Sequence, residues 1–221
     1  FFLILGLTMG LGSGVTASVA RYIGQKDKIK ADHCAEHAII IAFFISIIFT
    51  ILGLIFGKSI LILLGAKDLI LTQAWDYLFY ITFGLPFMVF SAFFRSVLAG
   101  EGDMKFPMIV AGLGTILNII LDPIFIFDLK DYGGFGLNLG VRGAALATVV
   151  SQSFTFTIFV FILYVKKYSY INYNFKKFIP SKLIFMDIVK VGVPASMSMV
   201  IMAFGQAVFN KILILYSAQT V

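Results

Sequence analysis

Long apolar segments with almost no charged residues alternate with short polar stretches along this chain. Four such segments contain 18 to 23 residues: Ala38–Phe56, Tyr77–Phe94, Phe106–Phe127 and Gly143–Val165. Each matches the roughly 20 residues that an α-helix needs to cross the hydrocarbon core of a bilayer. Two further segments predict spans in the same way, Phe1–Ala20 and the more polar Ile188–Leu215. The pattern therefore predicts an all-α, polytopic integral membrane protein with a bundle of about six transmembrane helices.

Composition supports a membrane protein and argues against a soluble domain. Of the 221 residues, 60% are hydrophobic and 13% are charged, and the mean hydropathy is +1.01. Soluble domains carry about 25% charged residues, because their surfaces face water. Cys34 is the only cysteine, so no intramolecular disulfide can form.

The chain has a net charge of +6. Its basic residues are concentrated in alternate loops, which indicates a membrane topology rather than a nucleic-acid site. The first, third and fifth loops, Arg21–Asp32, Arg95–Lys105 and Lys166–Lys190, carry twelve Lys and Arg residues. The second and fourth loops, Gly57–Thr72 and Asp128–Arg142, carry four. Cytoplasmic loops are enriched in basic residues. This distribution therefore predicts that the first, third and fifth loops are cytoplasmic.

Small residues recur every four positions in the first segment, at Gly6, Gly10, Gly14 and Ser18. This spacing places them on one face of a helix, where another helix can approach closely. The face predicts a close-packed helical partner.

Asp122 is the acidic residue expected inside an apolar helix, whereas the other acidic residues fall in loops or near helix ends. An acid within a span is costly and is a functional candidate for that reason. Asn118 lies one turn earlier on the same face, and Thr148 lies at a similar expected depth on the next helix. Oxygen ligands of this kind suit a hard cation or a proton. A solvated carboxylate near the interface, or one that caps a break at Pro123, is the alternative.

His33, Glu36 and His37 form the pattern His-x-x-Glu-His, which also occurs in zinc peptidases. The pattern lies at the start of a span, and the sequence offers no clear third ligand. A solvated helix start is the favoured interpretation, so no metal site, catalytic residue or enzyme activity is predicted here.

Four stretches carry a family resemblance through their order and spacing: Ser18–Asp27, Gly100–Met108, Asn118–Pro123 and Gly140–Thr148. Together they resemble the multidrug and toxic compound extrusion (MATE) family, within a larger group that includes lipid-linked sugar flippases. Gly192-Val193-Pro194 is similar to the opening of the second half of that family.

The resemblance implies two pseudo-symmetric bundles of six helices, of which this chain covers the second to the seventh helix. Residues 1–165 would be an amino-terminal lobe without its first helix, which would also leave the small-residue face without a partner. Residues 166–187 would be a cytoplasmic linker, and residues 188–221 the truncated first helix of the carboxyl-terminal lobe. In archaeal-type members, an Asp on the first helix, an Asn and an Asp on the fifth and a Thr on the sixth form a cation site. Asn118 and Asp122 match the fifth-helix pair, and Thr148 matches the sixth-helix residue.

The resemblance implies an antiporter of the cell membrane that exports amphipathic, often cationic, organic compounds against Na⁺ or H⁺ influx. Na⁺ or H⁺ would be held by Asp122, Asn118 and Thr148, with no other cofactor, no nucleic-acid partner and no required oligomer. A flippase for lipid-linked oligosaccharides is the alternative. Such a flippase should present several cationic side chains to its cavity, whereas only Lys190 and Lys211 are expected to enter spans. A metalloenzyme built on His33 and His37 is the alternative from another class of protein.

Overall fold

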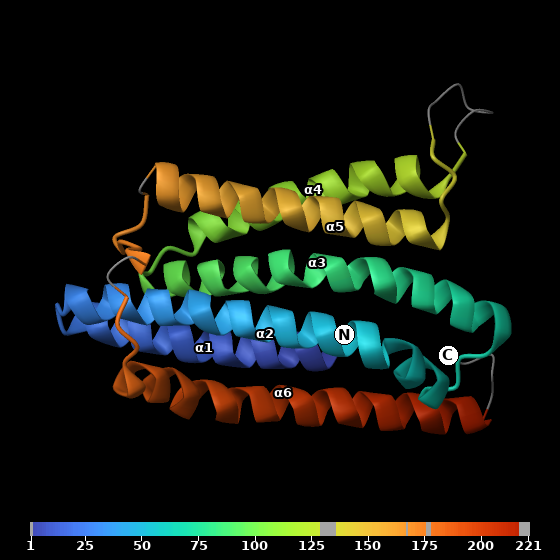
Figure 1. Cartoon of the computed structure of the whole chain (residues 1–221), viewed down its shortest axis with the longest axis horizontal. Coiled ribbons are helices and arrows are strands. Elements are labelled where there is room, and N and C mark those ends of the chain that lie inside the picture. The colour runs from blue at the N-terminus through green and yellow to red at the C-terminus, as the bar shows by residue number, and fades with distance from the viewer. Residues whose placement is uncertain (1, 129–135, 167, 176–177, 217–221) are drawn as a thin grey trace. The chain divides into compact units, whose positions relative to one another are not determined.

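The computed structural model describes residues 2–128, 136–166, 168–175 and 178–216, and this part of the chain is helical without strands (Figure 1). The helices are α1 (Phe2–Gly24), α2 (Lys28–Leu63), α3 (Asp68–Gly100), α4 (Lys105–Ile126), α5 (Val141–Val160) with the π-helical turn η2 (Phe161–Val165), and α6 (Lys182–Tyr216). Each of the six segments predicted as spans is helical over nearly its whole length. The helices extend beyond the predicted spans, because helical structure continues past the apolar residues into polar ones. For example, α2 begins ten residues before Ala38.

Large apolar side chains are exposed along most of these helices. On α2, for example, Phe44 is 58% exposed and Ile55 is 63% exposed. Helices α2, α3 and α4, the continuous stretch of α5 and η2, and α6 up to Gln206 are each long and apolar enough to cross a membrane. Exposed apolar surface on this scale has a favourable environment in lipid. The chain is therefore a multi-pass membrane protein.

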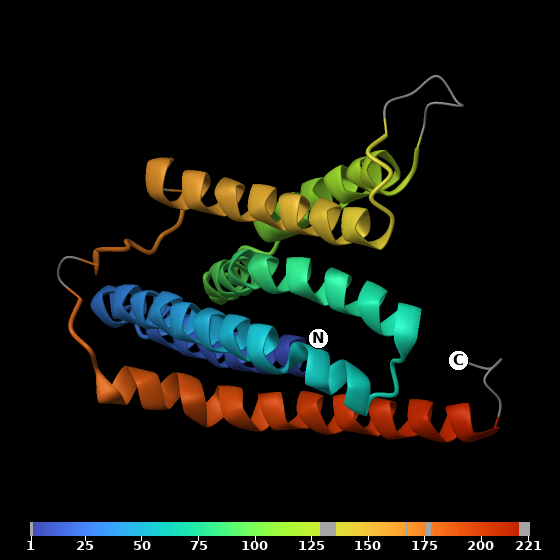
Figure 2. The same ribbon diagram turned by 45° about the vertical axis from the view of Figure 1, so that its right-hand side comes forward.

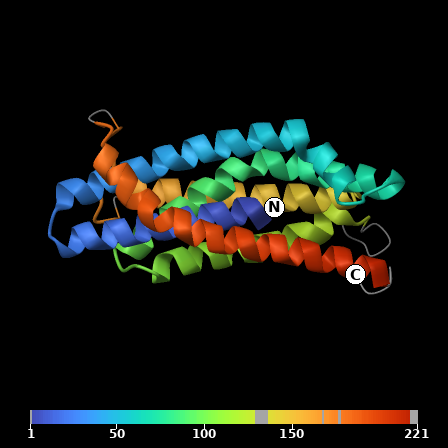
Figure 3. The ribbon, with the colours of Figure 1, turned by 90° about the horizontal axis from the view of Figure 1, so that it is seen from below.

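The chain forms two compact units. The first comprises residues 1–38, 96–102 and 173–221, and the second comprises residues 39–95 and 103–172. In the first unit, α1 lies along α6 (Figures 1 and 3). A Cβ atom on Gly10 would collide with the backbone of Ser196, and one on Gly14 would collide with the carbonyl of Ile188. The small-residue face therefore packs closely, as predicted. The expectation that this face lacks a partner is wrong, because α6 covers it.

Three chain segments with basic residues meet at one end of the first unit. Arg21 and Tyr22, at the end of α1, both donate hydrogen bonds to the carboxylate of Asp187 on α6. Gly100, at the end of α3, lies against Val19 so closely that a Cβ atom there would be 2.7 Å from the Val19 Cβ. The first loop, the third loop and the start of α6 thus share one side, which agrees with the predicted topology.

In the second unit, α4 and α5 lie side by side (Figure 2). A Cβ atom on Gly143 would collide with the carbonyl of Phe125, so glycine is required for this close approach. The amides of Leu137 and Leu139 donate to the carbonyls of Ile124 and Phe125 at 2.8 and 3.0 Å. These bonds satisfy carbonyl groups that the end of α4 leaves without helical partners, and they fix where α5 begins beside α4.

Aromatic side chains fill the core of the second unit. The Phe156 ring contacts three rings of α3, those of Phe87, Phe90 and Phe94, with centroids 5.6 to 6.2 Å apart. Phe159 is fully buried and contacts the rings of Phe94 and Phe106. This packing holds α5 against α3 and α4 within the unit.

Candidate functional site

The predicted pair on α4 is present in the second unit. Asn118 donates from Nδ2 to the Oδ1 atom of Asp122, with 3.4 Å between the two atoms, as expected for residues one helical turn apart. Both side chains are partly buried. Asp122 lies four residues before Ile126, where α4 ends, or about 6 Å along the axis. The amide therefore orients the carboxylate near one end of the helix.

Asp122 is not the only acidic residue that lies more than one turn inside a described helix. Glu36 and Asp76 each lie eight residues after the first residue of their helices, α2 and α3. The sequence placed both near the ends of predicted spans, whereas the helices extend beyond the apolar segments. Asp122 differs from these two residues in its side-chain amide partner, Asn118, which lines a polar cavity.

A polar cavity of about 260 Å³ lies between helices of the second unit, next to this pair. Asn118 and Thr148 both line it, so the structure brings these two predicted residues together. Asp122 is not among the residues that line it, and reaches it only through its hydrogen bond with Asn118. The polar residues of the lining are Arg95, Thr115, Asn118, Thr148, Ser151, Gln152 and Thr155.

Several of these residues were not expected from the sequence. Arg95 marks the end of an apolar segment, where a loop was predicted, yet it lies in α3 five residues before Gly100. Consequently Lys190 and Lys211 are not the only basic residues within helices. On α5, Thr148, Ser151 or Gln152, and Thr155 recur at helical spacing. This polar stripe in an apolar helix was the signal that could have identified the cavity.

The hydroxyl groups of the lining differ in their hydrogen bonding. Thr115, Thr148 and Thr155 each donate to the carbonyl four residues earlier, at 3.0 Å. The Ser151 hydroxyl is buried and has no hydrogen-bond partner among the described residues. The threonines therefore present acceptor lone pairs, whereas Ser151 retains an unused donor.

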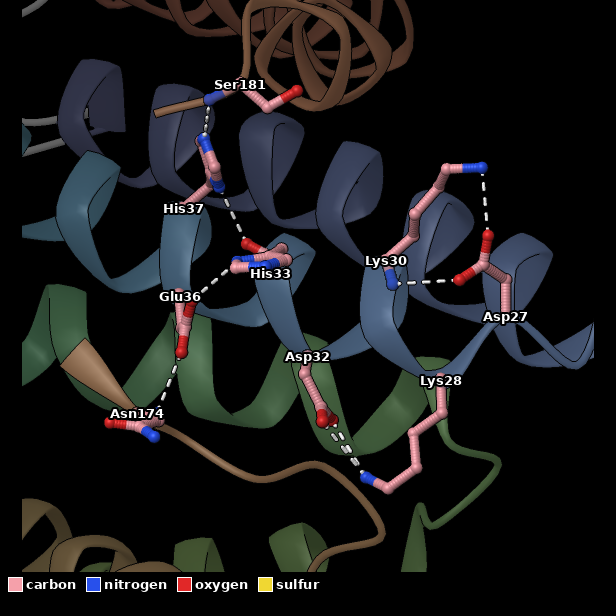
Figure 4. Close-up of polar contacts among 9 residues, drawn as sticks. All are labelled: Asp27, Lys28, Lys30, Asp32, His33, Glu36, His37, Asn174 and Ser181. Atoms are coloured by element: carbon pink, nitrogen blue, oxygen red, sulfur yellow. Dashed lines mark hydrogen bonds and ion pairs between the residues drawn. The ribbon is translucent and has the colours of Figure 1, made fainter. Parts of the chain in front are cut away.

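His33, Glu36 and His37 are in the first unit, and they connect α2 to the segment that precedes α6 (Figure 4). Glu36 accepts a hydrogen bond from the Asn174 amide at 2.8 Å and pairs with His33 at 2.9 Å. His37 accepts a bond from the Ser181 amide at 2.8 Å through Nε2. The expected solvated helix start is wrong for two of these residues, since Glu36 and His37 are only 2% and 5% exposed. The described contacts are structural, and the described residues contain no cluster of three potential metal ligands.

The sequence motifs also have local structural roles. Asp27 accepts a hydrogen bond from the Lys30 amide at the start of α2, and the Lys30 side chain helps hold the pKa of the Asp27 carboxyl below its ordinary value. Gly102 has a φ of +89°, a left-handed conformation that favours glycine. Asp103 then accepts bonds from the amides of Lys105 and Phe106 at 3.0 and 3.1 Å, which caps α4.

The described part of the chain, with its six long helices and its polar cavity between apolar helices, defines the class of protein as a multi-pass helical membrane protein. Comparison with known proteins identifies the family. The model of the MatE family matches residues 1–124. The chain belongs to this family, whose members are transporters.

Named relatives and a solved structure agree with this assignment. The multidrug export protein MepA of Staphylococcus aureus is 29% identical over 98% of this chain and 46% of its own length. A FAD transporter of Shewanella oneidensis is 29% identical over 74% of this chain and 35% of its own length. The outward-facing structure of a multidrug resistance MATE family transporter is 35% identical, with a TM-score of 0.88 over 97% of this chain and 46% of that one. The chain spans about half the length of the curated relatives that cover most of it.

Proposed function

We propose that the full-length protein is a secondary active antiporter that exports amphipathic organic compounds, organic cations among them, from the cell. Family membership supports membrane transport, and relatives named as multidrug proteins support efflux. The observation that carries the proposal in this chain is the hydrogen-bonded Asn118–Asp122 pair beside the polar cavity. Influx of Na⁺ or H⁺ through this site would drive export.

Each residue of the site has a distinct proposed role. Asp122 holds the coupling ion, since its carboxylate is the strongest ligand for a hard cation in this group. Asn118 orients that carboxylate and contributes its amide oxygen. Thr148 contributes a hydroxyl oxygen, because its hydrogen is already donated to the Ala144 carbonyl. Loss or gain of the ion would then bias the equilibrium between inward-open and outward-open states.

The proposal also covers cofactors, location and partners. The protein acts as a transporter and not as an enzyme, and uses no cofactor besides the coupling ion. It resides in the plasma membrane as a multi-pass protein, does not bind nucleic acid and needs no oligomer. The relatives differ in their named substrates, since one is a multidrug export protein and another a FAD transporter.

Transport by the full-length protein in vesicles tests the proposal. A fluorescent organic cation should move when a Na⁺ gradient or a pH gradient is applied, and applying the two gradients separately identifies the coupling ion. Asp122→Asn should abolish gradient-driven movement while leaving the amount of protein in the vesicles unchanged. Asp68→Asn is the matched control, because Asp68 is exposed and has a φ of 46° that asparagine tolerates. Undiminished transport by Asp122→Asn would exclude this site.

A further inference from the structure

The charge of the polar cavity is unusual for a site that binds organic cations. Among the described residues that line it, Arg95 is the only charged one, and none is acidic. The Arg95 guanidinium has neither a carboxylate partner nor a hydrogen-bond acceptor among the described residues. Arg95 is exposed in the described structure, so its guanidinium is accessible to a ligand that enters the cavity.

The other donors of the cavity point to the same kind of ligand. The buried Ser151 hydroxyl lacks a partner among the described residues, and Gln152 adds a side-chain amide to the lining. The three threonine hydroxyls already donate to backbone carbonyls, as described above. A ligand group that accepts several hydrogen bonds and carries negative charge would complement Arg95 and Ser151 together.

We propose that this cavity binds the anionic group, a carboxylate or phosphate, of the transported compound, with Arg95 as the residue that selects it. The inference rests on the proposed function and narrows its substrate class. Arginine suits this role because its planar guanidinium can donate two parallel hydrogen bonds to one carboxylate or phosphate. A cavity of about 260 Å³ is slightly smaller than the sites that enclose drug-sized ligands. The cavity therefore accommodates the anionic end of a compound. The rest of the compound, which can carry a cation, extends beyond the cavity.

The position of Arg95 separates this role from ion coupling. Arg95 lies five residues before the end of α3 at Gly100, about 8 Å from the side predicted to be cytoplasmic. Asn118, at the other end of the lining, is 13 residues after the start of α4 on that same side, or about 20 Å along the helix. The anionic group and the Asp122 carboxylate thus occupy different depths, so their repulsion is limited.

A pair of dyes that differ in one group tests the proposal without any gradient. Rhodamine B and its ethyl ester share the same delocalised cation, but only the former carries a free carboxylate. Binding of each dye to the purified full-length protein in nanodiscs is measured by fluorescence anisotropy against empty nanodiscs. The protein should bind the acid roughly 10-fold to 100-fold more tightly than the ester, the range expected for hydrogen bonds to charged groups. Inorganic phosphate at millimolar concentration should compete with the acid more than with the ester.

Variants assign the preference to Arg95. Arg95→Gln should remove the difference between acid and ester while ester binding persists, which shows that the cavity is intact. Arg95→Lys should restore part of the preference, because it keeps the charge but not the planar fork. Lys105→Gln is the matched control, since it removes one basic charge at the start of α4 outside the cavity, and it should keep the full preference.

Three outcomes would overturn the inference: equal binding of the two dyes by the unmodified protein, a preference that survives in Arg95→Gln, or a Lys105→Gln variant that loses it equally. If Arg95→Gln binds neither dye, Arg95→Lys decides, and binding without preference in that variant also overturns the inference. Failure of the proposed function is a separate result. A protein that binds the acid through Arg95 but moves no dye along an ion gradient would refute antiport and retain the anion site.

Discussion

The Nε2 atom of His37 on α2 accepts a hydrogen bond from the backbone amide of Ser181, 2.8 Å away and 144 positions later in the chain. The other ring nitrogen, Nδ1, lies 2.7 Å from the carbonyl of His33, so it carries the hydrogen and donates to that carbonyl. The two contacts define the neutral ring with the proton on Nδ1. Ser181 directly precedes α6, and its amide is one of the groups that a helix start leaves without a helical partner. A buried side chain of α2 thus fixes the start of α6 within the first unit.

Replacing His37 should therefore loosen the start of α6. His37→Ala in the full-length protein removes the acceptor of the Ser181 amide and should lower the free energy of unfolding by about 1–3 kcal/mol. Thermal unfolding in detergent measures the loss, and hydrogen–deuterium exchange should show faster exchange in the peptide that contains Ser181. His33→Ala is the control, because the His33 side chain is more exposed, and it should change exchange at Ser181 little. Unchanged exchange in His37→Ala would contradict the prediction.

Gly10 and Gly112 are both helical glycines, but only Gly10 meets another helix. A Cβ atom on Gly10 would collide with the backbone of Ser196, whereas one on Gly112 would meet nothing within 4 Å. Gly10→Ala should separate α1 from α6 and destabilise the protein by about 1–3 kcal/mol, the usual cost of overpacking. Gly112→Ala should be neutral or stabilising, by up to about 1 kcal/mol, through helix propensity. Melting temperatures of the two variants in one detergent measure the contrast, and equal effects would refute the close packing of α1 and α6.

The helices and the Asn118–Asp122 contact could be predicted from the sequence because both depend on local periodicity. Apolar segments of about 20 residues indicate spans, and residues four apart on a helix meet. Helix ends were predicted less well, because charged residues such as Arg95 were taken as loop residues although helical hydrogen bonding continues past them. The role of Arg95 in the cavity was missed for this reason.

Contacts between distant parts of the chain could not be predicted in the same way. Asp187 accepts bonds from Arg21 and Tyr22, but no periodicity relates residues about 165 positions apart. Burial of Glu36 and His37 has the same origin, because the segment that covers them contributes Asn174 and Ser181 from the far end of the chain. The local sequence of a helix start predicts exposure to solvent. Tertiary contacts with a distant segment bury the Glu36 and His37 side chains instead.

Thr148 and Thr157 provide a matched pair on α5 for the ion site. Each hydroxyl donates to the carbonyl four residues earlier, at 3.0 and 2.8 Å, but only Thr148 lines the cavity. Thr148→Val keeps the shape and removes the oxygen, so it should raise the half-saturating concentration of the coupling ion several-fold, as expected for the loss of about 1 kcal/mol. Thr157→Val should leave it unchanged. Ion dependence of dye transport in vesicles measures both, and an equal response of the two variants would exclude Thr148 from the site.

The predicted topology can be checked with single cysteines in a cysteine-free full-length protein. Cysteines at Lys28 and Phe175 should react with a membrane-impermeant reagent only when it reaches the cytoplasmic side, because these positions belong to the strongly basic loops. The sequence also suggested Tyr132 for the outer side, but that residue lies outside the described part of the chain. Lys67, which is exposed between α2 and α3, replaces it and should react from outside. Labelling of Lys28 and Lys67 positions from the same side would invalidate the assignment.

Arg142 at the start of α5 forms an ion pair with Asp76 on α3 within the second unit. Both Nε and one terminal nitrogen of Arg142 contact the same Asp76 oxygen, at 2.9 and 2.8 Å, and the two residues line a cavity of about 380 Å³. The Arg142 side chain is 55% exposed, so water screens the pair and its coupling energy should be only about 0.2–1 kcal/mol.

A double-mutant cycle with Asp76→Asn, Arg142→Gln and the combined variant measures this coupling through thermal unfolding of the full-length protein. Each single variant should destabilise the protein slightly, and the double variant should lose less than the sum of the two. The charge-reversed double variant, Asp76→Arg with Arg142→Asp, should recover stability relative to either reversed single variant. A coupling well above 1 kcal/mol would show that the pair is more strongly shielded from water than its exposure indicates. Strict additivity would show that the contact contributes nothing to holding α5 against α3, and that the aromatic contacts of Phe156 suffice.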